Sequence, residues 1–225
     1  TLFMTLLAGF SLLLSRYGGE EDVVVGTDIA NRNRIELEGL IGFFVNNLVL
    51  RIDLSGNPSF RELLRRVREM TLGAYAHQDL PFDQLVKAFR SRRNLGQTPL
   101  FQVLFVLQNA PAPPLRFSGL DLRPVEIDFG MSKFDLALFL VERREGLVGS
   151  WHYSTDLFRP DTIARATGHL MNLLASAAER PDARLSEIEM LSGPERELQE
   201  RKRQERDESS LGKLKNIRHR RAVLA

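Results

Sequence analysis

Hydrophobic residues recur along the first quarter of the chain with the periods of one helix and two strands. Residues 2–17 place leucine and phenylalanine on nearly every face of a helix, and a Gly-Gly pair ends it, so the pattern predicts a buried helix. The β-branched run at 22–27 predicts a buried strand, and apolar positions alternating imperfectly with polar ones predict a second strand at 42–54. The segment between these strands is polar and is expected to form a loop.

Helical spacing returns after residue 59. Ser59 is a favourable N-cap with Glu62 three residues later, and apolar residues then follow every three or four positions, which predicts a helix. Pro81 ends or bends this helix because a proline ring blocks the backbone hydrogen bond. Residues 82–89 predict one or two further turns, and the apolar run at 100–109 is the strongest strand signal in the chain.

The second half continues the mixture of strands and helices. Strands are predicted at 120–128, 134–146 and 147–158, the last two as a hairpin around a Glu-Gly pair. Residues 159–181 have the stripe of apolar residues that is typical of an amphipathic helix. The fold class is therefore α/β or α+β. We divide the chain into a globular part at 1–192 and a charged segment at 193–225, which is helical or disordered.

The charge and the rare residue types exclude several classes of function. The net charge of +2 is uneven, because from Pro194 onward ten basic residues face six acidic ones. This basic tail has no interleaved aromatic residues, so we interpret it as a solvated linker and expect no nucleic acid as a partner. The chain has no run of 18 apolar residues, so we expect no membrane partner.

The chain contains no cysteine and four scattered histidines, which excludes disulfides and thiolate sites and argues against a metal site. We expect a cytoplasmic protein, because the absence of cysteine fits a reducing compartment.

His77 is the most conspicuous candidate for chemistry. A general base needs a partner that orients it, and Asp79 lies two residues away. The segment "HQDLPF" also joins two predicted helices, where polar side chains satisfy backbone groups left over at helix ends. We favour this second interpretation, and the residues give no complete catalytic set.

Four further polar residues need an explanation because they lie within or beside apolar strands. Asn46 and Asn47 belong to a strand end or point into a pocket, and Gln102 invites the same two interpretations. Asp135 enters a predicted strand, where an ion pair with Lys133 or Arg123 is the expected role.

Several motifs in this order resemble the C-terminal half of the condensation domains of nonribosomal peptide synthetases. These are "GFFVNNLVLR" (42–51), "HQDLPFDQLV" (77–86) and "TPLFQVLFVLQN" (98–109), and the resemblance covers about residues 1–198. It implies a chloramphenicol-acetyltransferase-like lobe, a two-layer sandwich in which helices pack on a mixed sheet. In that family two such lobes enclose a tunnel, where an acceptor amine attacks a donor thioester to form an amide.

The resemblance also implies roles for individual residues. The catalytic motif of the family, HHxxxDG, belongs to the N-terminal lobe and is absent here, so this chain carries no catalytic residue and should be inactive alone. Asn46, Asn47, Phe101 and Gln102 should lie near the tunnel, and Asn47 stands where the family usually has threonine. The remaining motif residues are structural by this comparison: His77, Asp79, Pro81, Phe82 and Asp135. Arg90, Arg92 and Arg93 are candidates for contact with a carrier protein.

The implied partners are the N-terminal lobe and the upstream and downstream peptidyl carrier domains. No cofactor is expected on the chain itself, because the phosphopantetheine arm of a carrier brings the substrate. An adenylation domain or a hydroxylase could follow the basic tail. A noncatalytic platform that recruits a partner enzyme, such as a hydroxylase, to a carrier-bound substrate is the alternative function. A third possibility is an acyltransferase that uses free CoA thioesters, but the family motif DFGWG is incomplete in "DFGMS" (128–132).

Overall fold

The strands form a mixed sheet that carries the whole fold. The computed structural model describes residues 1–32, 34–89, 99–108, 119–120, 125, 130–144 and 146–204. Within these residues the sheet has five strands in the order β2-β1-β3-β4-β5. Their bounds are β1 (Asp22–Ile29), β2 (Asn46–Asp53), β3 (Val103–Gln108), β4 (Leu136–Arg143) and β5 (Gly146–Tyr153). The three central strands β1, β3 and β4 run parallel, and antiparallel strands close both edges.

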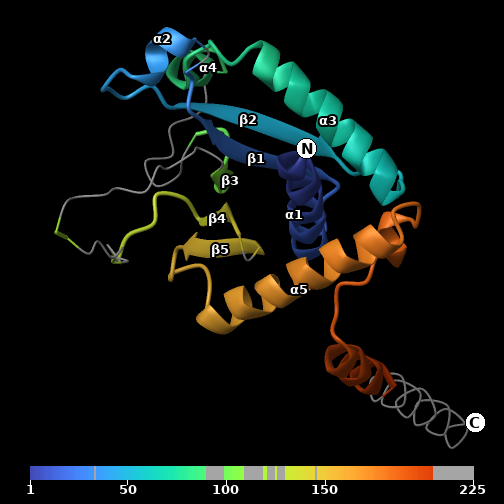
Figure 1. The fold of residues 1–225 in the computed structure, drawn as a ribbon. Helices are drawn as coiled ribbons and strands as arrows, with labels where there is room; N and C mark the ends of the chain where they lie inside the picture. Colours follow the sequence, from blue (N-terminus) through green and yellow to red (C-terminus); the bar gives the residue numbers. More distant parts are fainter. Residues whose placement is uncertain are drawn as a thin grey trace, which may run out of the picture.

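Three long helices cover one face of this sheet (Figure 1). They are α1 (Leu2–Gly18), α3 (Phe60–Ala76) and α5 (Pro160–Glu179), and α1 lies between the other two in contact with both. This position explains why α1 is apolar on nearly every face: the sheet and two helices surround it. Two short helices, α2 (Ile35–Glu38) and α4 (Phe82–Ala88), lie near the start of β2. The predicted layer of helices on a mixed sheet is confirmed.

Aromatic side chains fill the core between α1 and the sheet. Phe10 is fully buried, and its ring lies 5.4 Å from that of Phe105 and 5.9 Å from that of Trp151. Gly9 lets α5 approach α1 closely, because a Cβ atom there would lie 2.4 Å from a side-chain carbon of Leu174. Burial of these large side chains supplies the main driving force for the fold.

A smaller apolar cluster lies on the opposite face of the sheet. It consists of Phe101, Leu104, Val106 and Ala137, with partly buried neighbours. Phe101 is 1% exposed and lies directly over Gly26 of β1, where a Cβ atom would come within 2.1 Å of its ring. A larger residue at position 26 would therefore displace this ring.

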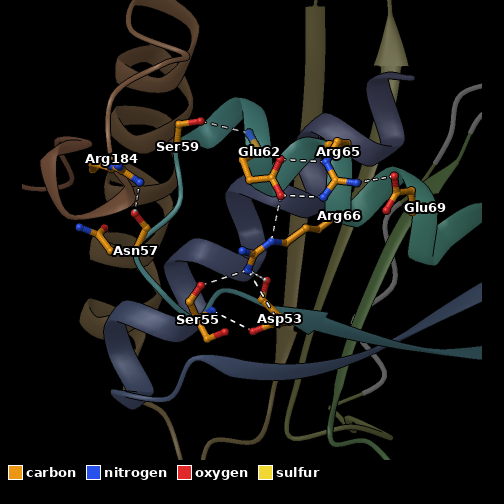
Figure 2. A network of polar contacts seen from close by, with 9 residues as sticks. All are labelled: Asp53, Ser55, Asn57, Ser59, Glu62, Arg65, Arg66, Glu69 and Arg184. Atoms are coloured by element: carbon orange, nitrogen blue, oxygen red, sulfur yellow. Dashed lines mark hydrogen bonds and ion pairs between the residues drawn. The ribbon is translucent and has the colours of Figure 1, made fainter.

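The chain after α5 forms a strap, residues 181–192, that returns across the helical layer. Its first half pairs with the turn before α3: Phe60 N donates to Ala183 O at 3.2 Å, and Leu185 N donates to Pro58 O at 2.8 Å. Figure 2 shows Arg184 donating to the carbonyl oxygen of Asn57 beside this pairing. The strap thus joins the C-terminal end of β2 to the end of α5, although these segments lie far apart in the sequence.

An ion-pair network fixes the start of α3 next to the strap (Figure 2). The side chain of Ser59 accepts a hydrogen bond from Glu62 N, as its N-cap position predicts. The Arg65 guanidinium beside Glu62 lowers the pKa of that carboxyl to about 2. Arg66 continues the network to Asp53 at the end of β2. These groups are exposed or partly exposed, so their contribution to stability is small.

Several predicted boundaries differ from the structure. The strand predicted at 42–54 begins only at Asn46, because residues 42–45 leave the sheet, and the strand at 100–109 is shortened to β3. The polar loop contains the short helix α2. Helix α3 ends at Ala76, before Pro81, because His77 is its C-cap. Most of the strand predicted at 120–128 lies outside the described residues.

We predict that Gly26→Ala destabilises the protein by roughly 1–3 kcal/mol, because the added methyl group overpacks the site against Phe101. Urea unfolding would show this as a lower midpoint with an unchanged slope. Gly73→Ala is the matched control: a Cβ atom there meets nothing within 4 Å, so this variant should gain roughly 0.5–1 kcal/mol from helix propensity. Equal midpoints for the two variants would contradict the packing argument.

Candidate functional site

The first two sequence motifs meet at one end of the sheet, where the parallel strands β1 and β3 end and β2 begins, and the third motif contacts the second through Phe101. Ligands of open α/β sheets bind at the carboxyl ends of parallel strands. Asn46 is the first residue of β2 and pairs with Ile29 at the end of β1. This register places the start of the motif at 42–51 beside the end of β1. The parallel strand β3, which belongs to the motif at 98–109, also ends there.

The Asn46 side chain forms three hydrogen bonds with the turn between α3 and α4. Its amide nitrogen donates to Gln78 O at 3.0 Å and to Leu80 O at 2.8 Å. Its carbonyl oxygen accepts from Phe82 N at 3.0 Å. Both donor hydrogens and one acceptor of the amide are therefore engaged with backbone groups of a single turn. Asn46 lies at this end of the sheet but holds the local structure together.

His77 also serves the backbone of this turn. It is the C-cap residue of α3, and its Nδ1 lies 2.9 Å from Gly73 O, one helical turn earlier. Its backbone nitrogen donates to Ala74 O, and its carbonyl oxygen accepts from Leu80 N. Asp79 lies in the same turn, and Pro81 is the N-cap of α4. His77 has the contacts of a residue that ends a helix.

Aromatic rings connect the turn to the third motif. The ring of Phe82 lies 5.6 Å from that of Phe101 in an edge-on arrangement, and Phe134 stacks on Phe101 at 5.5 Å. The backbone oxygen of Gln102 accepts from Asp135 N and Leu136 N, which aligns β3 with β4. Phe101 and Gln102 thus lie between the turn and the sheet.

Asn47 points to the opposite side of β2 from Asn46 and forms a polar pair with Asp28. The two residues are direct partners across β1 and β2, and the Asn47 amide donates to an oxygen of Asp28. Burial raises the pKa of the Asp28 carboxyl above its ordinary value, although the Lys133 charge and the Asn47 hydrogen bond both lower it. Sequence analysis missed Asp28, and the only available signal was a carboxylate directly after a β-branched strand.

The ion pair expected for Asp135 stays a prediction, because Arg123 lies outside the described residues. The contacts of Asp135 are made by its backbone: its nitrogen donates to Gln102 O at 3.1 Å, and its oxygen accepts from Ser154 N at 3.0 Å. Within the described residues its carboxylate forms no ion pair, because Lys133 lies close to Asp28 instead. The described residues do not include Arg90, Arg92, Arg93 or Arg123.

A cavity of about 280 Å³ opens at the same end of the sheet, between the start of α1 and the end of α3. Its lining is mixed: Phe3, Ile29 and Leu107 are apolar, whereas Thr27, Tyr75 and Gln78 offer polar groups. Pockets of this kind bind a largely apolar group with a few hydrogen bonds. The arrangement can position a ligand.

A stretch of apolar side chains beside this end of the sheet is exposed to solvent. Residues 35–45 include Ile41 and Phe43, which are 105% and 90% exposed. Arg32 supports this segment, because its guanidinium lies 4.3 Å from the ring centre of Phe44 and donates to Leu37 O. Clustered apolar exposure of this kind marks an interaction surface.

The described part of the chain offers no grouping of acidic residues and histidines that could hold a metal ion. Among the same residues, no helix has the length and apolar character needed to cross a membrane.

Comparison with known proteins decides the family. A family model for the condensation domain matches residues 1–199. The chain belongs to the condensation domain family. A linear gramicidin synthase of Brevibacillus parabrevis is 52% identical over 198 residues, which is 87% of this chain and 3% of that synthase. The resemblance read from the motifs is thereby confirmed.

Solved structures of condensation domains share the fold. The X-domain from teicoplanin biosynthesis, solved in complex with OxyB, is 33% identical with a TM-score of 0.74, and the match covers 85% of this chain and 43% of that one. A four-domain nonribosomal peptide synthetase gives a TM-score of 0.78 at 22% identity over 86% of this chain and 16% of that one, which supports the fold alone. This condensation-domain chain has the expected chloramphenicol-acetyltransferase-like fold, and it spans less than half of either solved chain.

We predict that Asp28→Asn makes this condensation-domain chain more stable at neutral pH. A carboxyl whose pKa is raised by folding contributes stability below its ordinary pKa of 3.8 and loses that contribution as the pH rises. The advantage of Asp28→Asn should therefore grow from about pH 3 to pH 7 in urea unfolding measurements.

Asp22→Asn is the control of opposite sign at the other end of β1. The hydrogen bond from Arg51 lowers the pKa of Asp22, so this variant should be slightly less stable at neutral pH and should match the parent in acid. A parallel pH profile for both variants would show that burial does not dominate at Asp28.

Proposed function

We propose that this chain is the C-terminal lobe of a condensation domain that forms peptide bonds between carrier-bound substrates. The amine of the acceptor attacks the thioester carbonyl of the donor. A C–N bond forms, the C–S bond breaks, and the thiol of the phosphopantetheine arm leaves as the amine loses its proton. The lobe contributes one wall of the tunnel and one face for a carrier protein, whereas the N-terminal lobe contributes the histidine motif.

The chain of contacts that links the three motifs is the observation that carries this proposal. Asn46 bonds to the turn of the second motif, and Phe82 of that turn contacts Phe101 of the third. Their contacts are with the lobe itself, which fits a part that positions substrates and leaves proton transfer to another part. Holding two reactants in the right geometry is a large share of catalysis in bimolecular reactions.

The exposed apolar segment at 35–45 supports the need for a second lobe. Ile41 and Phe43 would be costly to leave in water in a stable monomer, and covering them stabilises an assembly. We propose that the N-terminal lobe covers this segment and that Asn47 and Gln102 lie near the tunnel between the lobes.

The remaining roles are proposed from the sequence. Arg90, Arg92 and Arg93 form the face for a carrier protein, whose surface is acidic in this family. Residues 193–225 link the lobe to an adenylation domain or a hydroxylase.

A noncatalytic platform is the second candidate, and the likeness to the X-domain favours it. That domain was solved in complex with OxyB and is 33% identical to this chain. In this function the lobe would bind a loaded carrier and recruit a partner enzyme, with no amide formed.

Reconstitution separates the two candidates. The complete reading frame that contains this chain is mixed with an upstream and a downstream carrier domain, each loaded with an aminoacyl group. We expect a dipeptidyl group on the downstream carrier, detected by intact-protein mass spectrometry, and its loss when the upstream histidine motif is mutated. Binding of the loaded carrier without any product would contradict peptide-bond formation and support the platform.

A further inference from the structure

A chain of three hydrogen-bonded side chains joins α1, α5 and the helix after the strap on the side of the molecule away from the motifs. We call Tyr17, His169 and Glu195 the latch. The Tyr17 hydroxyl lies 2.8 Å from His169 Nδ1, and His169 Nε2 lies 3.1 Å from a carboxylate oxygen of Glu195. The rings of Tyr17 and His169 also meet edge-on at 5.8 Å. His169 is only 7% exposed, so both of its ring nitrogens depend on these partners.

The second oxygen of Glu195 caps the helix that Glu195 belongs to. Residues 193–204 are helical, and we call this segment the exit helix. Ser192 precedes it, and both its backbone N–H and its hydroxyl donate to Glu195 Oε2, at 2.9 and 2.6 Å. One carboxylate therefore begins the exit helix through one oxygen and attaches it to the lobe through the other.

The hydrogen bonds fix the positions of the protons in the latch. The Ser192 hydroxyl and backbone N–H, helped by His169, lower the pKa of Glu195 to about 2, so both of its oxygens only accept hydrogen bonds near neutral pH. His169 must then donate from Nε2, and in the neutral imidazole Nδ1 accepts from the Tyr17 hydroxyl. Arg165 of α5 is the other charged group that faces Tyr17.

The attachments of the strap become sparse where the exit helix begins. One stripe of α5 contacts the strap: Ser176 accepts from Glu189 N at 3.0 Å, Asn172 donates to Met190 O at 3.0 Å, and His169 follows one turn earlier. Beyond Met190, the hydrogen bond between His169 and Glu195 attaches the exit helix to the helical layer, and an exposed ion pair at 2.9 Å between Arg196 and Glu189 attaches it to the strap. Residues 196–204 are all exposed.

We propose that the latch fixes the direction in which the exit helix leaves the lobe and thereby sets the place of whatever follows residue 204. The strap up to Met190 is held by its own contacts with α5 and with residues 57–61, so the latch can open while the lobe stays folded. Opening it leaves the helix capped by Ser192 and held to the strap by the Arg196–Glu189 ion pair, which is exposed and therefore weak, so the helix can turn about the segment before it. The latch therefore restrains the orientation of the exit helix relative to the lobe.

Spin labels test this directly, because the chain has no cysteine of its own. Cysteines are placed at Met171, an exposed residue of α5, and at Glu200 in the exit helix of the full 225-residue chain. Double electron–electron resonance should give one narrow distance distribution. His169→Phe should broaden it about twofold or more, because it removes both hydrogen bonds but keeps the cap of the helix.

Two further variants keep the test decisive. Asn172→Leu is the matched control on the same stripe: it removes the bond to Met190 and should leave the distribution narrow. Tyr17→Phe removes a single hydroxyl from a residue that is 46% exposed, so this variant should fold even if His169→Phe does not. It should broaden the distance distribution less than His169→Phe. Narrow distributions in folded Tyr17→Phe and His169→Phe chains would overturn the proposal.

The proton assignment has its own measurement. The 15N shifts of the His169 ring should show a proton on Nε2 and none on Nδ1, and Tyr17→Phe should shift the Nδ1 signal. A proton on Nδ1 would overturn the latch as described. Neither experiment depends on whether the domain forms peptide bonds.

Discussion

The side-chain amide of Asn46 is the contact on which the arrangement of the motifs depends. It holds two carbonyl oxygens and one backbone nitrogen of the α3–α4 turn against the first residue of β2. Those backbone groups lie at the end of one helix and the start of another, where partners within the helices are lacking. With the turn fixed, Phe82 contacts Phe101, and Phe101 lies over Gly26 of β1. This end of the sheet is therefore held together by contacts within the chain itself.

The residues of the motifs fall into two groups in physical terms. Asn46, His77 and Phe101 are occupied by contacts within the lobe. The side chains that remain exposed at this end of the sheet are those of the loop before β2, such as Ile41 and Phe43. A chain built in this way can present a fixed surface to a partner. Its most conspicuous histidine, His77, ends helix α3.

Periodicity was sufficient to predict most of the elements, and side-chain pairing could not be predicted from it. The long helices and strands can be recognised from the spacing of their apolar residues, because each buries one face. Helix α1 buries nearly all of its faces. Asp28 was missed because its partner Asn47 is distant in sequence and becomes a neighbour only through the β1–β2 register. The boundary of β2 was placed too early because residues 42–45 are as apolar as the strand, yet Phe43 and Val45 are exposed to solvent. The Tyr17–His169–Glu195 latch depends on packing between three segments and leaves no local signal.

Native-state hydrogen exchange of the Phe82 amide tests the central role of Asn46 most directly. In the parent chain this amide donates to Asn46 Oδ1 and should be protected. Asn46→Ala should speed its exchange roughly 10- to 100-fold, because the turn loses three hydrogen bonds. Asn47→Thr, one residue away on the opposite face of β2, should leave it unchanged. If Phe82 exchanges at the same rate in the parent and in Asn46→Ala, then the hydrogen bonds of Asn46 do not hold this end of the sheet together.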